Sequence, residues 1–525
     1  MSSSKCEIED CKFETWEKGT KCVLHCNKNN ELEENSLKLF TSFYNILAEY
    51  VANQVDFSKI SIHTISGRDD FIQNIKSDVD EKIDISININ KVIFPNAERK
   101  DSYYFFKILK KIHKIFFIDC EFFGKELAGG IKSDLDIFYD TCIFHNEWII
   151  CNENNIVNGA AYYKCLFKEN VKYLPFLDNT DINANKFELN YTLFWDCELE
   201  KRVTFSNVKF NAPVFYHLGE ENEFKGKIDT IYFDNCTITE KSKLVINNHK
   251  IGRFILKDTE VKAKFEFKKN EVEEFFIYNS NFEKDLVVDM YETKFSKFNI
   301  SKSIFEGFVG FEKCVFSTKN YDINDQIAQF TYATFLSFVN FRNAKFYGGL
   351  DLENTNLKES PNFLNIEVNE KFSNRETFRI IKNAFDSVGN NLEGNKFFAY
   401  EMRKYREELK NTDKHAEKII FFLNEKISNF GQNYVRPIIL IIVTAIVFLL
   451  LTPEYEYNVL YLFDNECLNF DLMIASEFFN GLAKSILPLH KFLKEGMEFL
   501  SLIFYIIYVS LTWQTLVALK RHTKR

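Results

Sequence analysis

Turn-forming residues are scarce in this chain, which has only 7 prolines and 18 glycines among 525 residues. A long β-rich protein with so few of them is not expected to be a sandwich of short strands joined by tight hairpins. A basic stripe is also missing, since the formal net charge is −9 over the whole chain. Proteins that bind nucleic acid normally carry such a stripe, so we expect no nucleic-acid partner. The polar start, Met1–Cys11, has no apolar stretch, and we expect no secretory signal.

Motifs that would support catalysis are missing too. The sequence contains no Gly-rich phosphate loop, no nucleophile elbow and no HExxH segment. The histidines of the central region, His113, His145, His217 and His249, share no spacing. We expect each of them to be exposed or hydrogen-bonded rather than a ligand or a base, and we predict that the protein is not an enzyme.

Phenylalanine, in contrast, accounts for 57 of the 525 residues. From about Phe117 onward, short units recur in which a small or β-branched residue stands two places before Phe, Leu, Ile or Val. Residues two apart in a strand point to the same face, so both members of a unit are expected to face one core. The units are Cys120–Phe122, Cys142–Phe144, Cys165–Phe167, Val208–Phe210, Cys236–Ile238, Thr259–Val261, Ser280–Phe282, Ser303–Phe305, Cys314–Phe316, Ala333–Phe335, Ala344–Phe346 and Thr355–Leu357.

These units recur with a period of about 22 residues, and a fixed period indicates one structural unit that is stacked many times. The unit is too short for a pair of helices, so we predict a β-helix over residues 116–360. Steps of half this period also occur, as in the 11 residues from Phe305 to Phe316. The series advances by nearly equal steps through Phe122, Phe144, Phe167, Leu189 and Phe210, and after a longer step through Ile238, Val261, Phe282 and Phe305.

This pattern resembles the pentapeptide-repeat family, whose unit has a small residue two places before Phe or Leu. The resemblance implies a four-sided, right-handed β-helix. The chain departs from the family because its period is not a multiple of five, and because most of the usual Asp/Asn-Leu steps are missing. We therefore expect an irregular stack, with insertions at residues 211–232 and 317–330.

The segment 1–30 is a small cysteine-rich module with the spacing Cys6-x4-Cys11-x10-Cys22-x2-His25. Thiolate and imidazole ligands at such spacings suit tetrahedral zinc, and so short a segment has little core of its own. We predict a structural zinc site with these four ligands, since a full set leaves no open position for catalysis. Cys26 could replace His25 as the fourth ligand, and the alternative is a tail of reduced cysteines without metal.

Residues 31–115 are predicted to form a mixed α/β cap. Leu37, Phe40, Tyr44, Leu47 and Val51 fall at helical spacing. The segment Ile83–Ile89 alternates apolar and polar residues and is predicted to be a strand.

Residues 361–434 are predicted to be a helical juxtamembrane region. Helical patterns cover Arg375–Ser387 and Leu392–Lys410, broken by Gly389 and Gly394, and a third helix is expected over Asp413–Phe430. The segments Lys396–Leu409 and Ser428–Pro437 resemble the juxtamembrane part of bacterial pentapeptide-repeat membrane proteins, as does the basic ending Val517–Arg525.

Residues 435–525 are predicted to form two transmembrane helices, over 435–452 and 499–519. Lys and Arg residues precede the first span and follow the second, whereas the loop 453–498 holds three Lys against eight acids. The positive-inside rule then places both termini and the β-helix in the cytoplasm. Ile474, Phe478, Leu482 and Ile486 share one helical face between the spans, which suits an interfacial helix or a pore element. The eight cysteines outside the segment 1–30 are scattered, several of them next to β-branched residues, which indicates buried thiols in a reducing compartment.

Together these patterns predict a mainly β protein with α-helical parts: an irregular, right-handed, pentapeptide-type β-helix, a helical juxtamembrane region and two transmembrane helices. We expect it in the inner membrane of a bacterium, as a multi-pass protein. The predicted function is a non-catalytic scaffold or sensor that binds an unknown cytoplasmic protein and could form a homo-oligomer. The alternative is an oligomeric two-helix pore or effector gated by the cytoplasmic β-helix domain.

Overall fold

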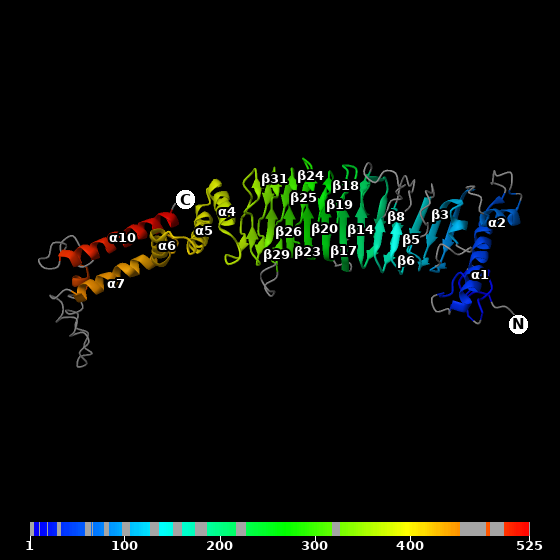
Figure 1. Cartoon of the computed structure of the whole chain (residues 1–525), viewed down its shortest axis with the longest axis horizontal. Coiled ribbons are helices and arrows are strands. Elements are labelled where there is room, and N and C mark those ends of the chain that lie inside the picture. The colour runs from blue at the N-terminus through cyan, green and yellow to red at the C-terminus, as the bar shows by residue number, and fades with distance from the viewer. Residues whose placement is uncertain are drawn as a thin grey trace, which may run out of the picture. The chain divides into compact units, whose positions relative to one another are not determined.

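The computed structural model describes residues 5–9, 11–17, 19–28, 33–57, 65, 67–77, 83–96, 105–125, 136–150, 160–173, 186–216, 227–317, 326–451, 479–483 and 498–523. The chain divides into two compact units, Met1–Asn369 and Glu370–Arg525. Figure 1 shows the first unit as a long series of strands and the second as helices.

The first unit consists mainly of short parallel strands arranged in five sheets, here called sheets I to V. Sheet I contains, in order, β1 (Ile83–Asn90), β3 (Ile112–Ile118), β5 (Asp136–Asp140), β8 (Ala160–Tyr163), β12 (Thr192–Trp195) and β16 (Phe215–Tyr216). Sheet II contains β36 (Glu367–Val368), β33 (Lys345–Phe346), β29 (Val315–Phe316), β26 (Lys294–Ser301), β23 (Glu271–Tyr278), β20 (Lys250–Lys257), β17 (Lys227–Asp234), β14 (Arg202–Ser206), β10 (Val171–Tyr173) and β7 (Trp148–Ile150), with β30 (Ala328–Thr331) between β26 and β34 (Leu350–Asp351).

The three remaining sheets are built from strands of two or three residues. Sheet III contains β11 (Phe187–Leu189), β15 (Val208–Phe210), β18 (Thr237–Ile238), β21 (Glu260–Val261), β24 (Asn281–Phe282), β27 (Ile304–Phe305), β31 (Thr334–Phe335) and β35 (Asn356–Leu357). Sheet IV contains β13 (Glu198–Leu199), β9 (Leu166–Phe167), β6 (Ile143–Phe144), β4 (Glu121–Phe122) and β2 (Ile93–Phe94). Sheet V contains β19 (Leu244–Val245), β22 (Phe265–Glu266), β25 (Val287–Asp289), β28 (Phe308–Gly310) and β32 (Val339–Asn340).

The chain visits these sheets in turn and then returns beside its own previous strand. After β20 on sheet II come β21 on sheet III and β22 on sheet V, and β23 then pairs with β20 in parallel. The register pairs Lys227 with Lys250, Lys250 with Glu271, and Glu271 with Lys294. One coil of this parallel β-helix-like solenoid therefore takes about 22 residues, which equals the period found in the sequence.

Each coil turns a corner at a residue in the left-handed region, directly before the first residue of a repeat unit. L-residues with a side chain rarely adopt this conformation, and Asn and Asp tolerate it best. At several corners the Asn side chains also bond between coils: Asn235 Nδ2 donates to Asn207 Oδ1 at 2.7 Å, and Asn279 Nδ2 donates to Asp258 Oδ1 at 2.6 Å. The corner residues, with φ between 48° and 58°, are Lys91, Asp119, Thr141, Lys164, Asp196, Asn207, Asn235, Asn248, Asp258, Lys269, Asn279, Glu292, Lys302, Lys313, Tyr332, Asn343 and Asn365.

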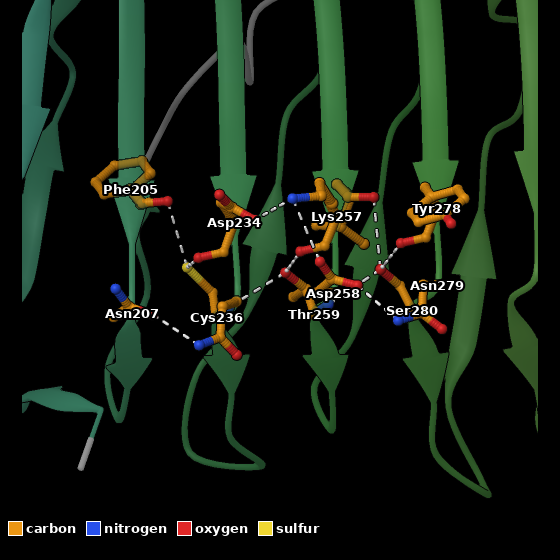
Figure 2. Close-up of polar contacts among 12 residues, drawn as sticks. Phe205, Asn207, Asp234, Cys236, Lys257, Asp258, Thr259, Tyr278, Asn279 and Ser280 are labelled. Atoms are coloured by element: carbon orange, nitrogen blue, oxygen red, sulfur yellow. Dashed lines mark hydrogen bonds and ion pairs between the residues drawn. The ribbon is translucent and has the colours of Figure 1, made fainter. Parts of the chain in front are cut away.

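The residue after each of these corners is buried, and where it is Thr or Ser its hydroxyl accepts a hydrogen bond from the preceding coil (Figure 2). The Cys236 N–H donates to Thr259 Oγ1 at 3.3 Å, and the Thr259 N–H donates to Ser280 Oγ at 3.1 Å. Each hydroxyl in turn donates to a carbonyl two residues earlier, Thr259 to Lys257 at 2.8 Å and Ser280 to Tyr278 at 2.9 Å. These hydroxyls satisfy backbone groups that would otherwise be buried without partners.

The large residue of each unit stacks on its counterpart in the next coil. On sheet IV the ring centroids of Phe94, Phe122, Phe144 and Phe167 follow one another at 4.8, 5.0 and 4.5 Å, with interplanar angles of 1°, 9° and 5°. All four side chains are buried. The inward direction of the Phe positions is therefore confirmed, and the rings fill the core between the sheets.

The series of apolar positions predicted from the sequence, from Phe122 to Phe210, nevertheless combined residues from two sides of the solenoid. Phe167 is followed on sheet IV by Leu199, whereas Leu189 lies on sheet III and pairs in register with Phe210. The step from Phe167 to Leu189 was therefore assigned wrongly. Every side of a coil repeats with the same period, so spacing alone does not distinguish one side from another.

The ladder is also longer than the predicted range of 116–360. It begins with β1 and β2, inside the segment 31–115 that was predicted to be a cap, and it ends with β36, which pairs with β33. The unit Val92–Phe94 has the same small-to-large spacing as the others and belongs to the first coil. Of the predicted insertions, residues 217–226 and 318–325 lie outside the described part of the chain.

In the described part of this region, the helices α1 (Glu33–Ala52), α2 (Arg68–Lys76) and α3 (Phe106–Leu109) precede or interrupt the first coils. The end of α1 covers the outer edge of β1. Asn90 N–H donates to Tyr50 Oη at 3.2 Å, and Gln54 Nε2 donates to the Asn88 carbonyl at 2.6 Å. These contacts occupy backbone groups of an edge strand that would otherwise be open to another chain.

The second unit contains α4 (Arg375–Ser387), α5 (Asn391–Leu409), α6 (His415–Ser428), α7 (Val435–Leu451) and α10 (Glu498–Thr523). The predicted helices of the juxtamembrane region agree with these bounds within two residues. Gly389, with φ +76°, lies between α4 and α5 as expected. Gly394, however, lies inside α5 and does not break it. A Cβ there would come 2.5 Å from Asp386 Oδ1, so this glycine permits α5 to approach the end of α4 closely.

The helices α7 and α10 pack together through Ala445, Phe448, Phe504 and Tyr508, while most other apolar side chains on both are exposed. Among the described helices, α10 alone is both long enough and apolar enough to cross a membrane. The apolar helix α7 is shorter, at 17 residues. Of the two predicted spans, therefore, one meets the length criterion. The predicted helical face between the spans falls outside the described residues except for Leu482, which packs against the α7–α10 contact.

A matched pair of glycine substitutions tests the close approach of successive coils. A Cβ on Gly307 would overlap the backbone oxygen of Leu286 in the preceding coil, whereas a Cβ on Gly67 would meet nothing within 4 Å. We expect Gly307→Ala to cost about 1–3 kcal/mol and to lower the melting temperature of the β-sheet circular-dichroism signal by several degrees. Gly67→Ala should change stability by less than about 0.5 kcal/mol. Equal melting temperatures for the two variants would contradict the coil packing.

Candidate metal centre

Two short loops bring the four predicted ligands together. The Cys6 N–H donates to the Phe13 carbonyl at 3.1 Å, which closes the loop that carries Cys11. The His25 N–H donates to the Cys22 carbonyl at 3.0 Å, which forms the turn that holds the other two ligands. Cys6, Cys22 and His25 are buried, and Cys11 is partly buried.

The donor atoms have the spacing of a tetrahedral site. All four lie within 4.8 Å of one another. Cys11 Sγ is 3.6 Å from Cys22 Sγ, and His25 Nδ1 is 3.5 Å from Cys6 Sγ and 3.2 Å from Cys22 Sγ. With usual zinc–ligand bond lengths, a tetrahedral ion separates two sulfurs by about 3.8 Å and a sulfur from a nitrogen by about 3.6 Å. Three thiols and one imidazole therefore fit a metal ion with a closed ligand shell.

Cys26 is not part of this group. Its Sγ donates to the Val23 carbonyl at 3.7 Å, and the four donor atoms that converge are those of Cys6, Cys11, Cys22 and His25. Of the two alternatives for the fourth ligand, the geometry brings His25 to the centre.

The imidazole of His25 is held in the form that binds metal. Burial lowers its pKa to about 4, and the charges of Lys28 and Lys21 act in the same direction, against a hydrogen bond to the backbone of Asn90. The ring is thus neutral at physiological pH. Since Nδ1 faces the thiols, the bond to Asn90 at the end of β1 orients the ring in the way that outer partners orient metal-binding histidines.

The thiols differ among themselves in their protonation. Burial raises the pKa of Cys22 to about 12. Burial would also raise the pKa of Cys6, but the N–H groups of Cys22 and Ile8 and the neighbouring thiols leave it below the ordinary value. The Cys22 N–H lies 3.2 Å from Cys6 Sγ. Metal binding to such a set releases protons from the thiols.

Lys28 connects this module to the first coil, a role that no sequence pattern indicated. Its buried Nζ donates to the carbonyls of Ile93 at 2.7 Å and of Leu24 and Cys26 at 3.1 Å. Burial lowers its pKa to about 8. The Ile93 N–H donates to the Leu24 carbonyl at 2.9 Å. Because β2 is the end strand of sheet IV, the module covers an open edge of the ladder, as a capping unit does in repeat proteins.

Histidines and cysteines elsewhere in the described part of the solenoid have structural contacts. His145 Nε2 lies 2.7 Å from Glu121 Oε2, and His249 Nδ1 lies 2.7 Å from the Asn247 carbonyl. His217 lies outside the described residues. The corner thiols donate to carbonyls of neighbouring coils, as Cys236 does to Phe205 at 3.6 Å, and burial raises the pKa of Cys236 to about 12. A buried thiol whose pKa is raised, such as that of Cys236, stays protonated and packs as a small apolar group.

Comparisons with protein-family models, with curated proteins and with solved structures give no match for this chain.

Metal content tests the ligand set directly. We expect about one zinc ion per chain in the reduced full-length protein, and less than about a tenth of that in Cys22→Ser, because a tetrahedral site loses most of its affinity with a ligand. Cys26→Ser, the adjacent cysteine outside the group, should keep its metal. Mass spectrometry of the metal after gel filtration measures both. Metal retained in Cys22→Ser, or lost from both variants, would contradict the assignment.

Chelation tests the connection between the metal centre and the ladder. Removing the metal should speed amide hydrogen exchange in β2, because the Ile93 N–H depends on a carbonyl of the metal-binding module. The control is β27 in the middle of the stack, where Ile304 donates to the Ser280 carbonyl at 3.0 Å and exchange should not change. Unchanged amide exchange in β2 would show that the metal does not stabilise the first coil.

Proposed function

We propose that the protein is a membrane-anchored, non-catalytic scaffold that presents one side of a β-helix to a cytoplasmic protein. In this proposal the solenoid is a right-handed β-helix related to the pentapeptide-repeat family, and zinc occupies the Cys6, Cys11, Cys22 and His25 site. The helices α7 and α10 form a two-helix hairpin in the inner membrane of a bacterium. Both termini lie in the cytoplasm.

A row of large aromatic side chains on the outer face of sheet I carries the scaffold proposal. The ring of Tyr163 lies 6.0 Å from that of Trp195, and the ring of Trp195 lies 4.4 Å from that of Tyr216. Cations flank the row, with Lys164 Nζ 5.2 Å from the Tyr163 ring and Lys243 Nζ 4.4 Å from the Tyr216 ring. Tyr and Trp dominate the binding energy of protein interfaces, and here the solenoid aligns them in register on consecutive coils.

The membrane hairpin is supported by the polarity of the two helices. Apolar side chains with exposed fractions of 39–53%, such as Ile438, Ile439 and Val443, cover the outside of α7, and similar side chains cover α10. The basic end of α10 lies beside the start of α7, since Arg521 Nη1 donates to the Phe430 carbonyl and His522 Nε2 lies 2.9 Å from the Gln432 carbonyl. The cationic ends of both helices thus share one side, which the positive-inside rule assigns to the cytoplasm.

Capture of partners from native membranes tests the scaffold. We expect a stoichiometric protein to co-purify with the full-length chain. Trp195→Ala should reduce its recovery by at least about tenfold, as a hot-spot residue does. Tyr278→Ala removes an exposed aromatic residue from another sheet and should reduce recovery by less than about twofold.

Purified protein in planar bilayers provides the opposing outcome. Reproducible single-channel conductance, with no partner captured by the full-length chain or its variants, would contradict the scaffold hypothesis and favour the oligomeric pore. Equal recovery with Trp195→Ala and Tyr278→Ala would keep a partner but exclude the aromatic row as its binding site.

A further inference from the structure

The helix α6 has its polarity reversed relative to a helix on a water-exposed surface. Four of its exposed side chains are large and apolar: Ile419, Ile420, Phe422 and Leu423, with exposed fractions of 61, 55, 45 and 46%. At 3.6 residues per turn these four positions fall within an arc of about 160°, so they share one side of the helix. Four aliphatic and aromatic side chains on a single 14-residue helix make a continuous apolar face toward the outside.

The opposite face of α6 is polar and is held inside the second unit. Glu417 Oε2 accepts a hydrogen bond from Tyr405 Oη at 3.1 Å, and Glu425 pairs with Arg406 of α5. Asn424 Oδ1 accepts from Gln514 Nε2 at 2.6 Å. The helix is thus fixed by hydrogen bonds and ion pairs on its inner face, and these contacts leave the apolar face turned outward.

The contacts with α10 place α6 at a defined depth. Ser428 Oγ donates to Gln514 Oε1 at 2.9 Å, so the end of α6 lies beside Gln514. Gln514 stands seven residues before Arg521 in α10, which corresponds to about 10 Å along the helix. If the basic end of α10 lies at the headgroups, this end of α6 lies about 10 Å inward, which is the depth that amphipathic helices reach in a bilayer interface, about 5–10 Å.

The connection to α7 fixes this position. The turn after α6 contains consecutive left-handed residues, Asn429 (φ 49°), Phe430 (φ 56°) and Gly431 (φ 81°). A Cβ on Gly431 would come 2.9 Å from Arg521 Nη1, so only glycine allows this arginine to reach the turn. This turn therefore holds the end of α6 beside the basic end of α10 and directly before α7.

We propose that α6 is an in-plane membrane helix whose outer face, Ile419, Ile420, Phe422 and Leu423, inserts among lipid acyl chains. The proposal rests on the membrane hairpin of the proposed function. Cations at its border suit the headgroup layer: Arg406 lies 5.3 Å from the Phe422 ring, and Lys426 Nζ lies 6.0 Å from it. Such side chains extend their charge toward water while their stems cover apolar surface.

Photo-crosslinking of the full-length protein in liposomes tests this placement. The photoreactive residue p-benzoyl-phenylalanine replaces, one at a time, Ile420 on α6, Ile439 on α7 and Val388 after α4. Ile439 is the control for the hairpin, and Val388 is an exposed apolar residue (74%) outside the proposed membrane contact. We expect the lipid adduct at position 420 to equal that at 439 and to exceed that at 388 by about tenfold.

The outcomes separate the two proposals. Lipid adducts at 439 but not at 420 would overturn the inference and leave the hairpin intact. Adducts at 420 that have twice the mass of the chain, or that contain another protein, would assign this face to a second copy or to a soluble partner instead of lipid. The absence of lipid adducts at 439 would overturn the membrane hairpin, and the inference on α6 would fall with it.

Discussion

The contact between one coil and the next, repeated at the spacing of paired strands, is the interaction on which the first unit depends. Parallel strands lie about 4.8 Å apart, and stacked aromatic rings settle at nearly the same separation. The rings of Phe316 and Phe346, for example, lie 4.3 Å apart with an interplanar angle of 4°. Backbone hydrogen bonds and ring packing therefore impose the same rise per coil. A corner residue in the left-handed region costs about 1–3 kcal/mol, and these shared contacts must offset that cost at every turn.

At the end of the stack, the same contact leaves a strand edge whose backbone groups lack a neighbouring coil. The N-terminal module covers this edge, although it has little hydrophobic core of its own. Leu24, Lys28 and the end of α1 occupy backbone groups of β1 and β2, and the converging thiols and imidazole hold the short loops in place. The second unit uses the reverse arrangement. Its helix α6 directs polar side chains inward and apolar ones outward, so its hydrogen bonds determine the helix positions and its surface is apolar.

Periodicity and ligand spacing made much of this predictable. The small-to-large units identified the side chains that point into the core, as for Ser280 and Phe282. Side chains in a strand point alternately to two opposite faces, and only one of these faces lies against the core. The helix Arg375–Ser387 was predicted to the residue, and the structure shows that Asn374 caps its start. The four residues Cys6, Cys11, Cys22 and His25 were grouped correctly by spacing. Phe167 and Leu189 were joined wrongly because equal periods on different sides are indistinguishable in one dimension. Lys28 and Asn90 have roles that depend on contacts distant in the sequence, which no local pattern records.

The alternation of inward and outward side chains also limits how the length of this chain can change. A single-residue insertion within a strand exchanges the buried and exposed sets in that coil. Gain or loss of one full coil, in contrast, keeps every ring and every corner in register. Evolution can therefore lengthen or shorten such a chain in whole turns, and two descendants of one gene can keep the same cross-section while differing in length.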